Sequence, residues 1–245
     1  MNFLTETVIG ILLPFVGTTV GAATVFFMKN RGNPRFHRAM LGFAAGVMTA
    51  ASVWSLLIPS IESAGSWIPA VTGFLVGTAA MTALDAVVPT PEPNKEPKLG
   101  ENLLLFIAVT LHNIPEGMAV GVAFAGAISG VLPISEALTL SIGISVQNFP
   151  EGTIISAPLV TDGMNKRKAF AYGVLSGAVE PVASIITVFL TWLVAPILPF
   201  VLSFAAGAMI YVVSQELIPE AKSRIGTAGT AVGFALMMML DVAMG

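Results

Sequence analysis

Every lysine and arginine of this 245-residue chain lies in alternate connections between long apolar runs. Apolar runs of about 20 residues between polar breaks predict helices that cross a bilayer, and eight such runs follow one another. They cover residues 4–28, 39–61, 67–88, 102–128, 132–160, 169–191, 197–219 and 226–244. The eleven basic residues fall only in the first, third, fifth and seventh connections: Lys29, Arg31, Arg35, Arg38, Lys95, Lys98, Lys166, Arg167, Lys168, Lys222 and Arg224. Because cytoplasmic loops collect positive charge, this alternation predicts eight spans with both termini outside.

The composition supports a membrane protein. Only 10% of the residues are charged and 55% are hydrophobic, whereas a soluble domain has about 25% charged residues. We therefore expect a single transmembrane domain over residues 1–245. The first run is too long for the apolar part of a secretory signal and has no basic residue before it, which favours a true span. The chain contains no cysteine, which excludes disulfides, thiolate metal sites and thiol redox chemistry.

Two matching polar hexads interrupt the fourth and fifth runs: His112-Asn113-Ile114-Pro115-Glu116-Gly117 and Gln147-Asn148-Phe149-Pro150-Glu151-Gly152. Ionisable groups inside a membrane are costly and are, by default, functional. The two hexads run through the membrane in opposite directions, which is typical of inverted repeats with a substrate site near the bilayer midplane. With three runs before them and three after, the sequence predicts an all-α integral membrane bundle in a 3+2+3 inverted repeat.

The residue types of the hexads suit an intramembrane divalent cation. His112 and Glu116 are four positions apart and therefore project from one face of a helix, and Gln147 and Glu151 repeat this spacing. Each hexad's proline bends its helix and frees backbone carbonyl oxygens near the site. Imidazole, carboxylate and amide ligands together suit zinc, iron(II), manganese or cadmium better than magnesium or calcium. The alternative is a pair of proline kinks whose polar groups bond to neighbouring helices, and two antiparallel copies weigh against it.

A third deep carboxylate, Glu180, precedes Pro181 in the sixth run. The predicted spans contain no lysine or arginine that could pair with these acids. Each deep carboxylate is therefore expected either to be protonated or to hold a cation. A purely structural role for Glu180 stays open.

Further polar residues lie near the two ends of the predicted spans. Four lie toward the cytoplasmic end: Asp85, Gln215, Glu216 and Glu220. They form a candidate exit site, although Asp85 and Glu220 are equally interpreted as interfacial residues that face water. Three lie near the outer face: Glu62, Glu136 and Asp241. Glu62 is a candidate entrance ligand, and Glu136 is interpreted as a first-turn acid that the helix dipole favours. His37, in the basic first connection, is interpreted as a solvated surface residue.

These motifs resemble the ZIP (Zrt/Irt-like) family of divalent metal transporters. The resemblance rests on the two hexads, on Val179-Glu180-Pro181 and on Gln215-Glu216-Leu217-Ile218-Pro219-Glu220. It covers essentially the whole chain and points to the bacterial GufA-like branch, in which the fifth-helix motif begins with glutamine. It implies import of zinc, with cadmium, iron and manganese as further candidates, across a bacterial plasma membrane. It also implies a homodimer and an elevator-like movement of helices 1, 4, 5 and 6 against helices 2, 3, 7 and 8.

The resemblance also assigns roles to residues of the motifs. It implies a first metal position formed by His112, Glu116, Gln147 and Glu151. It implies a second position formed by Asn113, Asn148 and Glu180, with Glu116 and Glu151 bridging between the two. It implies cytoplasmic release through Asp85, Gln215, Glu216 and Glu220. Two features depart from the family pattern: the connection 89–101 has no histidine, and Asn148 stands where relatives can have aspartate. One fewer negative charge predicts a more weakly held second ion, so a binuclear centre stays open.

Two other functions are weighed against cation transport. An intramembrane metal hydrolase would also use histidine and glutamate at helical spacing, but the chain lacks a His-Glu-x-x-His motif. The other is a proton- or sodium-coupled carrier of an organic substrate. An anionic substrate would need a basic residue or exposed helix N-termini at the site, and every lysine and arginine lies at the predicted cytoplasmic edge. We therefore expect a transporter rather than an enzyme, with the metal ion as its substrate and no resident cofactor. The expected partners are divalent cations, lipid and a second copy of the chain, and not nucleic acid.

Overall fold

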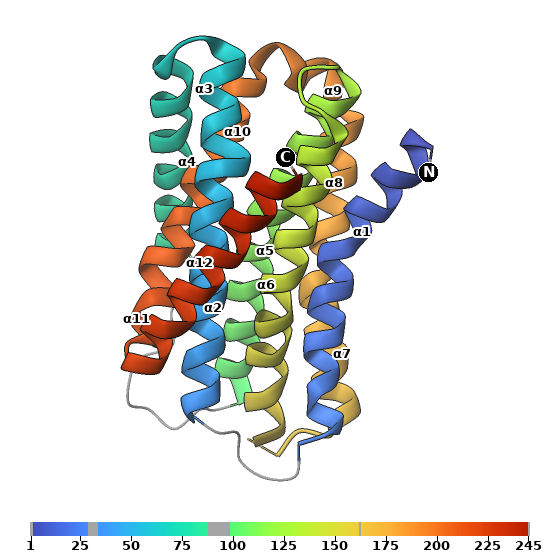
Figure 1. Ribbon diagram of the computed structural model, residues 1–245. Coiled ribbons are helices and arrows are strands. Elements are labelled where there is room, and N and C mark those ends of the chain that lie inside the picture. Colours follow the sequence, from blue (N-terminus) through green and yellow to red (C-terminus); the bar gives the residue numbers. More distant parts are fainter. Residues whose placement is uncertain (1, 29–33, 88–98, 162, 245) are drawn as a thin grey trace.

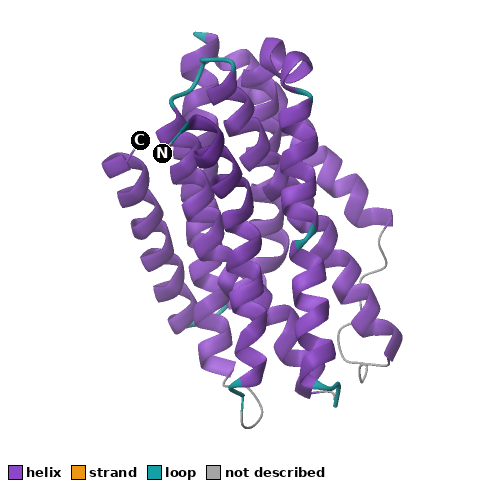
Figure 2. Ribbon diagram, turned by 90° about the vertical axis from the view of Figure 1, so that its right-hand side faces the viewer, coloured by secondary structure: helices purple, strands orange, loops and turns teal. Residues whose placement is uncertain are grey.

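The chain folds into a bundle of long helices, seen from two sides in Figure 1 and Figure 2. The computed structural model describes residues 2–28, 34–87, 99–161 and 163–244, and every regular element in these ranges is helical. The elements in chain order are α1 (Phe3–Ala22), η1 (Ala23–Phe26), α2 (Pro34–Ala51), η2 (Ser52–Leu57), α3 (Ile58–Ala64), α4 (Trp67–Val87), α5 (Leu99–Ile128), α6 (Ile134–Thr161), α7 (Lys166–Gly177), α8 (Val179–Phe189), α9 (Thr191–Val194), η3 (Ala195–Ile197), α10 (Leu198–Val212), η4 (Val213–Leu217), α11 (Ile218–Ala221) and α12 (Arg224–Met244).

The helices lie where the apolar runs predict them. By length and composition, six helical stretches of the described chain can cross a membrane: Phe3–Phe26, Pro34–Ala64, Trp67–Ala86, Lys166–Phe189, Thr191–Ala221 and Arg224–Met244. The described part of α5 adds the shorter apolar helix Asn113–Ile128. The prediction of an all-helical membrane protein is therefore supported, whereas eight spans with both termini outside stay a prediction.

The helices pack into two bodies. Helices α1, α5, α6, α7 and α8 pack against one another, and we call them the hexad body because α5 and α6 carry the two hexads. Helices α2, α3, α4, α10, α11 and α12, with η2 and η4, form the frame body. The bodies meet where α2 and α12 contact α6 and where α10 contacts α5.

Glycines bring helix backbones together inside each body. A Cβ atom at Gly17 of α1 would clash with the carbonyl oxygen of Ser145 on α6, and one at Gly42 of α2 would clash with a carbonyl oxygen of α12. Small residues allow this close approach. The same relation holds for further glycines inside the bodies: Gly21, Gly46, Gly73, Gly77, Gly117 and Gly152. Between the bodies, by contrast, Gly143 of α6 faces the flexible side chain of Met237 on α12.

Two helices of the frame body are interrupted by a π-helical segment at matching places. Segment η2 ends directly before Ile58-Pro59, and η4 ends directly before Ile218-Pro219. Proline lacks an N–H group and crowds the carbonyl group four residues earlier, so the helix widens before it. In Figure 1, α2 runs upward and α10 runs downward toward α11. One local structure is therefore repeated in opposite directions, which is consistent with the predicted inverted repeat.

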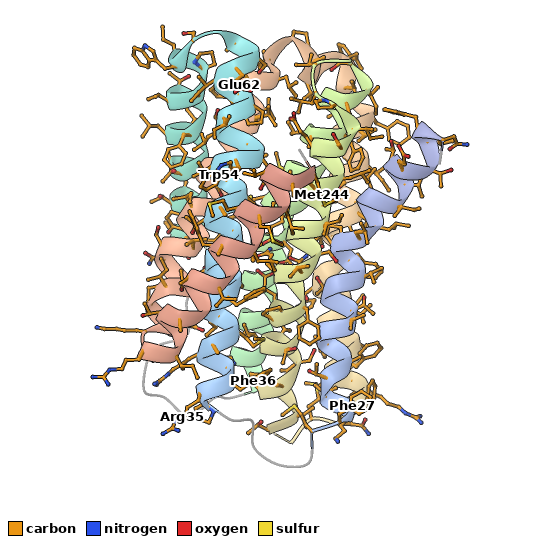
Figure 3. All side chains as sticks on the ribbon, in the orientation of Figure 1. Phe27, Arg35, Phe36, Trp54, Glu62 and Met244 are labelled. Carbon is orange, nitrogen blue, oxygen red and sulfur yellow. The ribbon has the colours of Figure 1, made fainter. Side chains whose placement is uncertain are left out.

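The two ends of the bundle differ in charge. Figure 3 labels Arg35 at the lower end and Glu62 at the upper end. At the lower end, Lys166 Nζ at the start of α7 donates a hydrogen bond of 2.7 Å to the carbonyl oxygen of Met28. We call this lower end, where α1 ends and α2 and α7 begin, the basic end. Both chain termini lie nearer the opposite end (Figure 1), so the basic end corresponds to the predicted cytoplasmic side.

Candidate metal site

Glu180 of α8 is completely buried inside the hexad body. Its Oε1 accepts hydrogen bonds from Thr18 Oγ1 at 2.9 Å and from Asn113 Nδ2 at 3.3 Å. Its Oε2 accepts a hydrogen bond of 2.8 Å from Asn148 Nδ2. Hydrogen bonds to a charged group are stronger than those between neutral groups, so these three donors offset part of the cost of burying the carboxylate. Because the donors come from α1, α5 and α6, Glu180 joins four helices of the hexad body.

The two asparagines of the predicted second metal position also bond elsewhere in the protein. Asn113 Nδ2 donates a second hydrogen bond, of 3.0 Å, to the carbonyl oxygen of Ser176. Asn148 Nδ2 donates one of 3.4 Å to the carbonyl oxygen of Pro14, and Asn148 Oδ1 accepts one of 2.7 Å from Gln147 Nε2. The structure therefore brings the three residues of this position together as a hydrogen-bonded cluster.

Glu116 and Glu151 line a cavity of about 250 Å³. Their side chains come from α5 and α6 and are 2% and 8% exposed, and their carboxyl groups are in hydrogen-bond contact. Asn113 lies in the wall of the same cavity. No lysine or arginine is among the described residues that line it. Two adjoining buried carboxylates need a shared proton or a cation to compensate their charge.

Two oxygen atoms of the second hexad are buried without a hydrogen-bond partner in the described part of the chain. They are Gln147 Oε1 and Glu151 Oε2, and the Gln147 side chain is completely buried. A buried acceptor without a donor costs about 1–3 kcal/mol. A bound cation satisfies such oxygens, because carboxylate and amide oxygens are ordinary ligands of divalent metals. Both atoms belong to residues of the predicted first metal position.

His112, the remaining residue of that position, lies in α5 one turn before Glu116. Its side chain lies outside the described residues. Among the side chains that the structure describes, no three histidine, aspartate or glutamate residues gather closely enough to hold an ion. To hold an ion, these two carboxylates would therefore need further ligands, such as His112, amide or backbone oxygens, or water.

The predicted exit residues divide into two groups. Glu216 of η4 is half-buried and Glu220 of α11 is exposed, and both line the cavity. Gln215 is exposed and is not among the described residues that line it. Asp85 of α4 is not among them either, and its Oδ2 accepts a hydrogen bond of 2.7 Å from the Tyr211 hydroxyl. Of the four predicted exit residues, the structure brings Glu216 and Glu220 to the cavity.

Sequence reasoning misses two residues at the site. His37 of α2 is half-buried and lines the cavity, so its interpretation as a solvated surface residue is wrong. A usable signal existed, because His37 stands one turn before Leu41 on the apolar face of α2. The second residue is Thr18, whose signal was a hydroxyl group on the small-residue face that Gly17 and Gly21 form on α1.

The predicted outer acids lie at the end opposite the basic end. Glu62, labelled at the top of Figure 3, and Glu136 line a second cavity of about 260 Å³. Glu136 stands in the first turn of α6, as expected. Asp241 Oδ1 accepts a hydrogen bond of 2.6 Å from Ser55 Oγ, which joins η2 to α12.

The chain is similar in sequence to named zinc transporters from bacteria and animals. A family model described as "ZIP Zinc transporter" matches residues 95–241. The zinc transporter ZIP11 of Xenopus tropicalis is 36% identical, over 98% of this chain and 97% of that protein. The zinc transporter ZIPB of Bordetella bronchiseptica is 37% identical over 97% of this chain and 81% of ZIPB, and GufA of Myxococcus xanthus is 43% identical over 60% and 58%. Together with its apolar helices, this similarity makes the chain a multi-pass membrane protein of the ZIP zinc transporter family.

Proposed function

We propose that the protein imports zinc into the cytoplasm through the cavity that Glu116 and Glu151 line. The observation that carries this proposal is the contact between these two buried carboxylates, one from each hexad, in the wall of one cavity. Ionisable groups at membrane depth are costly and mark ion pathways. The similar proteins are named zinc transporters, and zinc accepts carboxylate and imidazole ligands.

We assign the first metal position to Glu116, Glu151, Gln147 and His112. The assignment is supported by the buried oxygens of Gln147 and Glu151 that lack a donor in the described chain. When zinc arrives, it takes the place of the proton that two adjoining carboxylates otherwise share. A transport site has to release its ion, so we expect moderate rather than tight binding.

A second ion at Asn113, Asn148 and Glu180 requires a rearrangement. The two amide nitrogens now donate to the Glu180 carboxylate, and a cation at this position needs the amide oxygens instead. The amide groups therefore have to rotate before a metal binds there. We propose that this position fills after the first and holds its ion more weakly.

An elevator movement is supported by the way the two bodies are built. Inside each body, glycines let helix backbones approach closely, so each body is tightly packed. Between the bodies, a side chain such as that of Met237 meets Gly143, and side chains rearrange when packed helices shear. We propose that the hexad body carries the ion while the frame body stays in place.

The cavity supports a direction of release. Its wall includes Glu216 of η4 and Glu220 of α11, and α11 lies in the lower half of Figure 1, toward the basic end. We propose that this is the inward-facing state and that these two carboxylates contact the ion as it leaves. Roles in release for Asp85 and Gln215, a homodimer and a bacterial plasma membrane stay predictions from the resemblance, as do cadmium, iron(II) and manganese as further substrates.

The proposal is tested by uptake of radioactive zinc into proteoliposomes that contain the purified full-length protein. Cadmium, iron(II) and manganese are added as competitors, with and without an imposed pH gradient. We expect zinc uptake above that of empty vesicles, with the competition order ranking the substrates. Folded protein that takes up no divalent cation under either gradient would rule out the transporter.

A further inference from the structure

Three basic residues stand in the first turn of α7, at the basic end of the hexad body. They are Lys166, Arg167 and Lys168, and this turn contains no acid. Asp162, the one acid of the connection before α7, lies outside the described residues. The first turn of a helix favours negative charge and disfavours positive charge. Three cations at this place are therefore stabilised by an anion from outside the helix.

Lys166 bonds inside the protein, whereas its two basic neighbours do not. Lys166 Nζ donates hydrogen bonds to the carbonyl oxygens of Met28 at 2.7 Å and of Phe26 at 3.4 Å, which fixes the start of α7 against the end of η1. Arg167 and Lys168 are exposed. Among the described residues, neither of their side chains has a hydrogen-bond or ion-pair partner. Two cationic side chains are therefore available to an external ligand.

An exposed aromatic side chain lies beside these cations. Phe27 is 84% exposed, and Figure 3 labels it at the lower end of the bundle. The two carbonyl groups that hold Lys166 belong to the residues on either side of Phe27. The ring of Phe26 contacts that of Phe170 on α7, with centroids 5.2 Å apart. A large apolar side chain that projects from the protein is more stable in the acyl region of a membrane than in water.

The two parts of this surface match the two parts of an anionic phospholipid. The phosphate group attracts the two cations, and arginine forms paired hydrogen bonds with phosphate. Clusters of lysine and arginine at the cytoplasmic membrane surface bind anionic lipids. The acyl chain of such a lipid contacts an exposed aromatic ring, which a free phosphate ion does not. The positive-inside rule accounts for the sign of the charge but not for the ring beside it.

We propose that Arg167, Lys168 and Phe27 bind an anionic phospholipid of the cytoplasmic leaflet, the cations at its headgroup and the ring at its acyl chain. We call these three residues the lipid surface. Both α7 and η1 pack against α1 and α6, so a lipid bound here holds the hexad body. An effect of the lipid on transport rests on the proposed function, whereas the binding itself does not.

Native mass spectrometry of the full-length protein in detergent tests the binding. The probes are dioctanoyl phosphatidylglycerol, which is anionic, and dioctanoyl phosphatidylcholine, which carries no net charge. We expect the unmodified protein to retain at least about threefold more of the anionic lipid. The double variant Arg167→Gln and Lys168→Gln should lose this preference and keep its fold, because both side chains are exposed. Equal retention of the two lipids by the unmodified protein would overturn the proposal.

The double variant Lys222→Gln and Arg224→Gln is the matched control. It also removes one lysine and one arginine from exposed positions. These residues stand after α11 and at the start of α12, across the bundle from α7 in Figure 1. The control should keep the preference for the anionic lipid. An equal loss in both double variants would mean that overall charge attracts the lipid, and the lipid surface would be rejected.

The variant Phe27→Gln distinguishes a phospholipid from a phosphate ion. Removal of the ring should lower retention of phosphatidylglycerol at least about twofold although the charges stay in place. Sodium phosphate, at the same concentration of phosphate groups, should not displace the lipid from the unmodified protein. Unchanged retention by Phe27→Gln, or displacement by phosphate, would show that the surface binds phosphate alone.

Zinc uptake shows whether the bound lipid acts on the hexad body. The unmodified protein should transport at least about threefold faster in vesicles of phosphatidylethanolamine and phosphatidylglycerol than in vesicles of phosphatidylethanolamine and phosphatidylcholine. The double variant Arg167→Gln and Lys168→Gln should transport equally in both. Equal rates for the unmodified protein would contradict an action on the hexad body. Because lipid binding is measured without zinc, its failure and a failure of zinc transport are distinguishable.

Discussion

The carboxyl group of Glu116 on α5 contacts that of Glu151 on α6 in the wall of one cavity. Glu180, the third deep acid, accepts hydrogen bonds from Thr18, Asn113 and Asn148 instead. The polar residues of the hexads therefore form two different structures. One is a pair of acids that face a cavity, and the other is a hydrogen-bonded cluster that joins four helices and has Asn113 in the cavity wall.

The variant Glu151→Ala is expected to lose zinc uptake, down to the level of empty vesicles. The change removes one of the two carboxylates that face the cavity, while the relief of like-charge repulsion keeps the fold intact. Uptake into proteoliposomes measures the loss of transport, and the elution profile of the detergent-solubilised protein shows whether the fold is intact. Glu6→Ala, near the start of α1, is the control and should transport normally. Normal uptake by Glu151→Ala would refute the site.

The helices could be predicted because the sequence marks them twice. Apolar runs predict the positions of the helices, and the basic residues in alternate connections predict the direction in which each helix crosses the membrane. The division into hexad body and frame body could not be predicted, because small residues recur along most of the runs. Which glycine meets which carbonyl group, as Gly17 meets Ser145, depends on tertiary packing.

Part of the site could also be predicted from the sequence. The hexads mark Glu116 and Glu151 because acids in apolar runs are rare. Thr18 and His37 carry no such mark, since a threonine and a histidine near a helix end are common. The sequence also does not distinguish the two environments of the deep acids. Glu180 is surrounded by donors, whereas Glu151 faces a cavity, and the packing of α1, α5 and α6 around α8 produces this difference.

The variant Gln147→His is expected to change the order in which metals compete for uptake. The substitution replaces an amide oxygen that lacks a donor in the described chain with an imidazole nitrogen. Imidazole is a better ligand for zinc than for manganese. Competition of manganese and cadmium against radioactive zinc measures the change, with the unmodified protein alongside. An unaltered order would show that Gln147 is not a ligand.

The variant Thr18→Val is expected to destabilise the protein by about 1–3 kcal/mol, because a buried carboxylate loses a donor. The neighbouring variant Thr19→Val is the matched control, since Thr19 Oγ1 has no hydrogen-bond partner in the described chain. Denaturant unfolding in detergent compares the free energies of unfolding of both variants. Equal stability of the two would argue that the Glu180 cluster does not hold the hexad body together.

The variant Gly17→Ala is expected to cost about 1–3 kcal/mol of stability, because its Cβ meets the backbone of α6 and the helices have to move apart. Gly143→Ala should cost less, because there the Cβ meets only the flexible side chain of Met237. Thermal unfolding in detergent ranks the two variants. The reverse ranking would contradict the description of two bodies that are closely packed by glycines and meet through side chains.

The central claim is that the transported ion binds between the two hexads at Glu116 and Glu151. Anomalous diffraction from crystals of the full-length protein grown with zinc measures this directly. We expect a zinc peak about 2.0–2.2 Å from a carboxylate oxygen of each glutamate, and loss of that peak in Glu151→Ala. Zinc bound elsewhere in the protein, with both carboxylates free of metal, would contradict the account.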